Sequence, residues 1–165
     1  MVFNSLDELK KYILSQSQVA IEKTQEKVAT IIKHFLDEYY KEFSPEVYIR
    51  TNQLLNSLVK SDIKNVGDGW VAEVYFDISK LDYSKREVPK GQPWSDYASE
   101  NNTYHRKNWT KENDEWVLET AMTGSKPHGG YAGGTAIWTE SMEVLDKQAI
   151  KILKEELIKA GIPVR

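Results

Sequence analysis

The first 45 residues constrain the fold more than any other part of the chain, because they predict one unusually long helix. Ser5-Leu6-Asp7-Glu8 has the spacing of a capping box, in which a serine and a glutamate side chain satisfy backbone amides of the first turn. A stripe of apolar residues follows at helical spacing: Leu6, Leu9, Ile13, Ala20, Val28, Ile31, Ile32, Phe35, Tyr39 and Phe43. Ser44-Pro45 ends this stripe, since a residue before proline is disfavoured in a helix. We therefore predict a long helix within residues 1–44.

The length of this helix matters because it exceeds the size of the domain. A helix of about 38 residues is roughly 57 Å long, whereas a domain of 165 residues has a radius of gyration of about 15 Å. Either one end of the helix extends beyond the core, or the helix breaks. The polar stretch Ser15-Gln16-Ser17-Gln18 is where we expect the overhang or the hinge. An overhanging half is typical of a helix that docks on a partner; a kinked helix that folds back on its own domain is the alternative.

Residues 45–78 predict a short helix followed by a hairpin. The short helix covers residues 51–58, with Thr51 as its candidate N-cap. The hairpin strands cover residues 58–65 and 70–78, and the second strand alternates apolar with polar residues. Two glycines of the turn between them supply the positive φ angles that a tight hairpin needs.

Residues 115–165 predict a strand, a glycine-rich loop and a closing helix. The strand covers residues 115–123, the loop residues 124–134 and the helix residues 140–160, with Thr139 as its candidate N-cap. Its apolar stripe consists of Met142, Leu145, Ala149, Ile152 and Leu153. Gly161 followed by Pro163 is a typical C-terminal stop. The whole chain, residues 1–165, predicts a single α+β domain with a long N-terminal helix and a C-terminal helix packed on a small, mainly antiparallel sheet.

Residues 79–114 interrupt this regular pattern with aromatic and basic residues. A structureless segment of this length inside a domain is usually functional. Aromatic residues and arginine are enriched at protein–protein contacts, whereas aromatics interleaved with basic residues also suit nucleic acid, and packing on the own domain is the third interpretation. The candidate interface residues are Trp94, Tyr97, Tyr104, Arg106 and Trp109 of this insertion and Tyr12 and Ile13 of the long helix.

Catalytic and metal chemistry finds little support in the sequence. The chain has no cysteine, and its three histidines, His34, His105 and His128, do not have the spacing of metal ligands. His128-Gly129-Gly130-Tyr131 resembles the oxyanion loop of some lipases, but the Gly-x-Ser-x-Gly motif of their nucleophile is absent. We therefore expect no catalytic residue, metal or cofactor. A small hydrolase or transferase that uses the His128 loop, or a nucleic-acid-binding accessory protein, is the alternative.

Net charge and hydropathy give no support to two further classes of partner. The formal net charge is only −3, which gives no general attraction to nucleic acid or to an anionic membrane. No segment approaches the roughly 18 consecutive apolar residues of a membrane span. We expect no membrane partner.

One segment resembles a known family. Residues 45–58 resemble the motif that follows the long first helix in head–tail joining proteins of tailed phages, also described as minor capsid, neck or tail-completion proteins. The matching positions are Tyr48, Arg50, Thr51, Leu54 and Ser57. That family commonly has a Glu-aromatic-Gly-Thr stretch before its last helix, to which residues 134–138 are a loose counterpart, and residues 79–114 are longer than expected.

The resemblance implies a structural virion component without catalytic residues. Such proteins form homo-oligomeric rings, such as hexamers or dodecamers, between the portal or connector and the tail tube. The implied partners are further copies of the chain and the neighbouring neck and tail proteins, with DNA only as a molecule passing through the channel. The implied location is the virion, assembled in the host cytoplasm. A closed ring needs two different contact surfaces on each subunit, and we predict that the long helix supplies one and the insertion the other.

Overall fold

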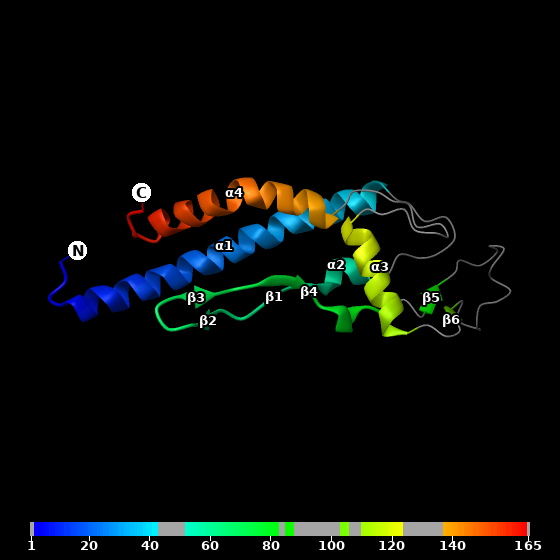
Figure 1. Cartoon of the computed structure of the whole chain (residues 1–165), viewed down its shortest axis with the longest axis horizontal. Helices are drawn as coiled ribbons and strands as arrows, with labels where there is room; N and C mark the ends of the chain where they lie inside the picture. The colour runs from blue at the N-terminus through cyan, green and yellow to red at the C-terminus, as the bar shows by residue number, and fades with distance from the viewer. Residues whose placement is uncertain are drawn as a thin grey trace. The chain divides into compact units, whose positions relative to one another are not determined.

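The computed structural model describes residues 2–42, 52–82, 85–87, 103–105, 110–123 and 137–164. Its elements in chain order are α1 (Leu6–Glu42), α2 (Gln53–Ser57), β1 (Leu58–Lys60), β2 (Lys64–Asn65), β3 (Trp70–Val71), β4 (Val74–Phe76), the 3₁₀ helix η1 (Ile78–Lys80), β5 (Lys85–Glu87), β6 (Thr103–His105), α3 (Lys111–Thr123) and α4 (Ile137–Lys159) (Figure 1). A long N-terminal helix, a C-terminal helix and small antiparallel strand pairs confirm the predicted α+β class.

The long helix α1 is continuous over 37 residues. Ser5 Oγ accepts the Glu8 N–H at 3.1 Å, as the capping box predicts, while Glu8 Oε2 accepts the Asn4 N–H at 2.8 Å instead of that of Ser5. In the polar stretch, the Ser17 hydroxyl donates to the Leu14 carbonyl at 3.0 Å. The predicted hinge, and with it the kinked helix, is wrong, because α1 continues as one helix through this stretch.

The described residues group into two compact units. The first unit comprises Met1–Ile32, Val59–Tyr75 and Ser141–Arg165, and the second comprises Lys33–Leu58 and Phe76–Glu140. The expected single domain over residues 1–165 stays a prediction.

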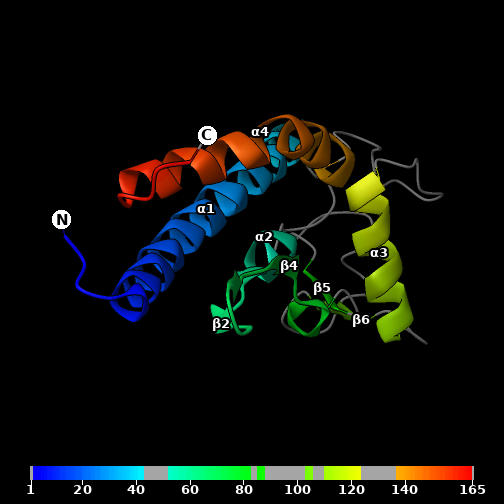
Figure 2. The ribbon, with the colours of Figure 1, turned by 60° about the vertical axis from the view of Figure 1, so that its left-hand side comes forward.

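In the first unit, α4 runs beside α1 in both views of the ribbon (Figures 1 and 2). Ala20 and Ile32 of α1 and Leu145 and Ile152 of α4 are buried, so the predicted apolar stripes of both helices supply this core. Burying such side chains is the main stabilising contribution in a unit of this kind.

The C-terminus of α4 confirms the predicted stop. Gly161 has φ 84°, its N–H donates to the Ile158 carbonyl at 3.0 Å, and the Ile162 N–H donates to the Leu157 carbonyl at 2.9 Å. These are the two bonds of a Schellman motif. The N-terminus differs from the prediction, because α4 begins at Ile137, whose fully buried side chain anchors the first turn, and Thr139 lies inside the helix instead of capping it.

The hairpin of the first unit has the predicted turn but shorter strands. β2 and β3 are antiparallel, with Lys64 opposite Val71 and Asn65 opposite Trp70, and β1 pairs with β4. Gly67 in the turn has φ 89°, whereas Gly69, the other glycine for which a positive φ was predicted, does not have one. The two long strands predicted here are each divided, because the Ser61 hydroxyl accepts the Glu73 N–H at 2.9 Å between the two strand pairs.

The second unit contains two departures from prediction at its short helices. The N-cap position of α2 is Asn52, with φ 56°, and not Thr51, which lies outside the described residues. The predicted strand over residues 70–78 ends early, with β4 at Phe76, and its last residue, Ile78, begins η1. The reason is that Asp77 Oδ1 accepts the Ser79 N–H at 3.0 Å and starts a helical turn.

The segments predicted as an irregular insertion and a strand contain β5, β6 and α3. β5 and β6 are antiparallel, with Arg86 opposite Tyr104. The strand predicted over residues 115–123 is wrong, since these residues belong to α3. Asn113 Oδ1 accepts the Thr110 N–H at 2.9 Å and the Asn113 N–H donates to the Thr110 carbonyl at 3.1 Å, which caps the first turn. Asp114 and Glu112 in that turn favour the helix through its dipole.

Candidate interaction surfaces

Most of the predicted interface and motif residues lie outside the part of the chain that the structure describes. These residues are Trp94, Tyr97, Arg106 and Trp109 of the insertion and Tyr48, Arg50 and Thr51 of the motif. Tyr104 lies in β6 opposite Arg86. The roles of all these residues stay predictions.

The two motif residues that are described lie in the interior of the second unit. Leu54 and Ser57 of α2 are both buried. The Ser57 hydroxyl donates to the Leu54 carbonyl at 2.8 Å, and the Ser57 carbonyl accepts the Asp77 N–H at 2.8 Å. These two residues therefore hold α2 against the start of η1.

The N-terminal turns of α1 extend past the elements that pack on the rest of the helix (Figure 1). The hairpin turn reaches α1 at Lys10, whose Nζ lies 2.8 Å from Asp68 Oδ1. The end of α4 reaches α1 at Tyr12, whose Oη would lie 2.8 Å from a Cβ at Gly161. Residues 2–9 lie beyond both contacts. An overhang is therefore present, but at residues 2–9 and not at the predicted residues 15–18, beside which Trp70 Nε1 of the hairpin donates to the Leu14 carbonyl at 2.8 Å.

The overhang exposes apolar side chains. Val2 is 88% and Leu6 is 82% exposed, and Ile13 one heptad further along α1 is also exposed. The ring of Tyr12 packs on Phe3, with 5.2 Å between the ring centroids. The predicted interface residue Ile13 therefore lies on an accessible surface, whereas Tyr12 contacts residues of its own chain.

Two buried polar side chains link the helices and the hairpin of the first unit. Gln25 Nε2 donates to the Ser61 carbonyl at 3.0 Å and to the Glu73 carbonyl at 2.9 Å. Glu156 Oε1 lies 2.8 Å from Lys159 Nζ and 2.7 Å from Lys27 Nζ. Hydrogen bonds from Lys159 and Lys27 hold the pKa of the Glu156 carboxyl below its ordinary value.

Sequence reasoning missed both side chains, although one of them left a signal. Glu156 follows Leu145 and Ile152 at helical spacing, which places a carboxylate on the buried stripe of α4 and predicts a cationic partner. Gln25 has no comparable signal, because its partners are backbone carbonyls of a hairpin distant in sequence.

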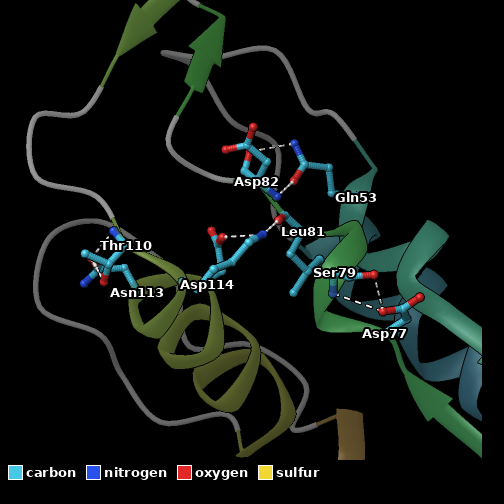
Figure 3. A network of polar contacts seen from close by, with 9 residues as sticks. Gln53, Asp77, Ser79, Leu81, Asp82, Thr110, Asn113 and Asp114 are labelled. Atoms are coloured by element: carbon cyan, nitrogen blue, oxygen red, sulfur yellow. Dashed lines mark hydrogen bonds and ion pairs between the residues drawn. The ribbon is translucent and has the colours of Figure 1, made fainter.

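A polar network joins three parts of the second unit (Figure 3). Gln53 of α2 makes two bonds to the backbone of Asp82: its Nε2 donates to the carbonyl at 3.0 Å and its Oε1 accepts the N–H at 2.6 Å. Lys111 Nζ donates to the Leu81 carbonyl and lies 3.2 Å from Asp114 Oδ2. The network thus fixes the chain after η1 between α2 and the first turn of α3.

Two of the three histidines lie within the part of the chain that the structure describes. His34 is exposed, and its ring packs on Phe35 with 5.3 Å between centroids. His105 lies in β6 opposite Lys85. His128 and the glycine-rich loop lie outside the described residues, so the alternative that depends on them stays a prediction. Within the described ranges, no group of three or more histidine, aspartate or glutamate residues is arranged to hold a metal ion.

Among the known protein families, the model of the YomN family matches residues 5–160 of the chain. This chain belongs to the YomN family. YomN is a protein of a Bacillus phage of the SPβ type, and the match therefore indicates a phage origin. No curated protein and no solved structure matches the chain.

The YomN match covers nearly the whole chain: the second unit lies within it, and so does the first unit apart from residues 1–4 and 161–165. It includes the overhang of α1 from Ser5 onward, the polar network of the second unit and all of α3 and α4. In the described part of this YomN-family chain, no helix is long and apolar enough to cross a membrane.

Proposed function

We propose that this protein is a structural component of a tailed-phage virion, a neck, head–tail connector or tail-completion subunit that assembles into a homo-oligomeric ring. Membership of the YomN family supports the phage setting. The resemblance of residues 45–58 to head–tail joining proteins supports the position at the neck.

One observation carries the assembly part of the proposal: the apolar overhang of α1. Val2, just before α1, and Leu6, in its first turn, are almost fully exposed, whereas the contacts of α1 with the hairpin turn and with the end of α4 begin further along the helix, at Lys10 and Tyr12. Exposing large apolar side chains at adjacent positions costs solubility without stabilising the subunit, and such surfaces are typical of protein–protein contacts. An overhanging helix of this kind fits the contact that a subunit makes with its neighbour.

The proposal assigns partners and a location. The partners are further copies of the chain, as in a hexamer or dodecamer, and the adjoining neck and tail proteins, while DNA only passes through the channel. The protein works in the virion after assembly in the host cytoplasm. Its role is mechanical, and no catalysis is assigned to it.

The test measures the mass and shape of the assembled protein. Native mass spectrometry and light scattering on the full-length chain, at concentrations from about 1 to 100 µM, are expected to detect a closed oligomer. The fraction of the protein in this oligomer is expected to increase with concentration. Negative-stain images are expected to show rings. The double variant Leu6→Ser with Ile13→Ser is expected to weaken assembly, whereas the matched change Val66→Ser with Val71→Ser, on the exposed hairpin, serves as the control.

A monomer at every concentration, both alone and mixed with the neck and tail proteins of the same phage, contradicts the proposal. Rings of the wild type that are unaffected by the Leu6 and Ile13 substitutions contradict the role of the overhang and leave the ring itself in place.

A further inference from the structure

The exposed face of α3 is acidic and carries an aromatic residue. Glu112, Glu115 and Glu119 are exposed and lie three to four residues apart, which places them on one face of the helix. Trp116 lies within this set and is 43% exposed. Asp114, on the opposite side, is buried. We call Glu112, Glu115, Trp116 and Glu119 the acidic face.

One stretch of the exposed surface of α4 is basic, although the helix carries exposed acidic residues beside it. Ile150 is 71% and Ile158 is 57% exposed, and they lie two turns apart. Three exposed lysines lie near these isoleucines: Lys147 and Lys154, three and four residues from Ile150, and Lys151, directly after it and seven residues before Ile158. Acidic residues of α4 border this set: Glu143, Asp146 and Glu155. We call Lys147, Ile150, Lys151, Lys154 and Ile158 the basic face.

The two faces also match in length. Seven residues separate Glu112 from Glu119, and seven separate Lys147 from Lys154, so each charged set spans about 10 Å of its helix. Each set encloses one large exposed side chain, Trp116 in the first and Ile150 in the second. Within the described residues, Lys147, Lys151, Lys154 and Glu115 take part in none of the ion pairs.

We infer that the acidic face of α3 in one copy of the chain docks on the basic face of α4 in the next copy. This contact rests on the proposed function and names the surfaces that the ring uses. In a closed ring every subunit presents one surface to the preceding neighbour and a different one to the following neighbour. One chain that carries both an acidic and a basic face of equal length meets that requirement with a single kind of contact.

The energetics divide between the apolar and the charged residues. Trp116 and the two isoleucines lose exposed apolar area on docking, and tryptophan is the residue type most enriched among those that dominate binding. The charges add specificity and speed of association more than affinity, because a wrong pairing places like charges against each other. The contact buries only part of a standard interface of about 800 Å² on each partner, so the overhang of α1 adds to it.

The sharpest experiment mixes two variants that cannot assemble alone. The first carries E112K and E115K and so presents two basic faces, and the second carries K147E and K154E and so presents two acidic faces. Each by itself places like charges at every contact and is expected to assemble about 100-fold more weakly than the wild type. An equimolar mixture restores opposite charges at every contact, and it is expected to assemble within about fivefold of the wild type. Native mass spectrometry with one variant isotopically labelled then detects alternating subunits.

Matched controls change the same charges elsewhere. E22K with D62K, and K33E with K64E, alter exposed side chains of α1 and the hairpin and are expected to leave assembly unchanged. Trp116→Ala is expected to weaken assembly about 30-fold at any salt concentration. The effect of the charge reversals shrinks in 1 M salt, where the Debye length is about 3 Å. Circular dichroism checks that each variant retains its helices.

The outcomes separate this contact from the ring itself. Assembly of the mixture with alternating subunits, when each variant alone is a monomer, supports the contact. A wild type that forms rings while both reversed variants form them equally well contradicts the contact and leaves the proposed function standing. Two variants that fail alone and also fail together contradict the pairing of these two faces. A wild type that never assembles contradicts the proposed function and this contact together.

Discussion

The contacts that stabilise the first unit internally differ from those that stabilise the second. In the first unit, single buried side chains of the long helices make the contacts between elements, as Gln25 does with the hairpin and Glu156 with α1. In the second unit, short elements are joined by several polar bonds that lie close together, from Gln53 to Asp82 and from Lys111 to Leu81. Losing one side chain is therefore expected to affect the first unit more than the second. The following predictions test that difference, beginning with the largest effect.

Replacing Gln25 with leucine is expected to be the most damaging polar substitution in the first unit. The change leaves the carbonyls of Ser61 and Glu73 without their side-chain donor, which lowers the free energy of unfolding by about 2–3 kcal/mol. Urea denaturation measures this loss. Gln18→Leu, at an exposed position of the same helix, is the control and is expected to change stability by less than about 0.5 kcal/mol. Equal stability of the two variants contradicts the anchoring role of Gln25.

Replacing Gly161 with alanine is expected to lower the free energy of unfolding by about 2 kcal/mol. About 1 kcal/mol comes from the left-handed backbone at φ 84°, and the rest from the Tyr12 hydroxyl, 2.8 Å from the new Cβ. Gly67→Ala is the matched control, because Gly67 also has a positive φ but has open space around its Cβ position. Thermal unfolding of both variants, and of Gly161→Ala combined with Tyr12→Phe, separates the two contributions. A Gly161→Ala variant as stable as Gly67→Ala shows that Tyr12 adjusts freely.

The C-terminus of α4 and the start of α3 show what the sequence can and cannot predict. Gly161 followed by Pro163 predicts the end of α4 correctly, because the signal lies in the left-handed backbone that glycine itself favours. The pattern of residues 115–123 predicts a strand, although these residues belong to α3, whose first turn is capped by Thr110 and Asn113. A helix cap can be recognised in a sequence only when the residues after it are assigned the periodicity of a helix and not that of a strand.

The candidate surfaces, like the helix ends, could be predicted from the sequence only in part. That α1 has an overhang follows from helix length alone, and the exposed Leu6 agrees with it, but the polar stretch at residues 15–18 does not mark its place. The faces of α3 and α4 could not be foreseen, because a residue's exposure depends on which side of its helix the rest of the unit covers. Trp116 and Ile150 are as apolar in the sequence as the fully buried Leu36, and only the tertiary structure distinguishes them.

Gln53→Ala tests the second unit. The substitution removes both side-chain bonds to Asp82, but the Asp82 backbone is exposed and can bond to water instead. We expect a loss of about 1 kcal/mol, smaller than that of Gln25→Leu. Asn56→Ala, at an exposed position of the same short helix, is the control. Hydrogen exchange is expected to show faster opening at Asp82 in Gln53→Ala, while α3 retains the protection given by the bond from Lys111 to Leu81. A loss of hydrogen-exchange protection along all of α3 contradicts the idea that the bonds of this network stabilise the unit independently of one another.

The smallest effect is expected from the titration of Glu156. Hydrogen bonds from Lys159 and Lys27 hold its pKa in the folded chain below the ordinary value of 4.5, so its contribution to stability is fully present above pH 4.5 and is lost as the pH falls through the lower folded value. Lys159 behaves in the opposite sense, because its raised pKa gives a contribution that is lost at alkaline pH, above 10.5. The difference in unfolding free energy between the wild type and Glu156→Gln is therefore expected to be constant near neutral pH and to shrink at both extremes. A Glu26→Gln variant, whose carboxylate pairs with Lys23 on an exposed part of α1, is expected to give a smaller difference at every pH. If the two variants cannot be distinguished, then the buried position of Glu156 between α1 and α4 contributes no more than an exposed pair, and Gln25 is the stronger of these two buried polar contacts of the first unit.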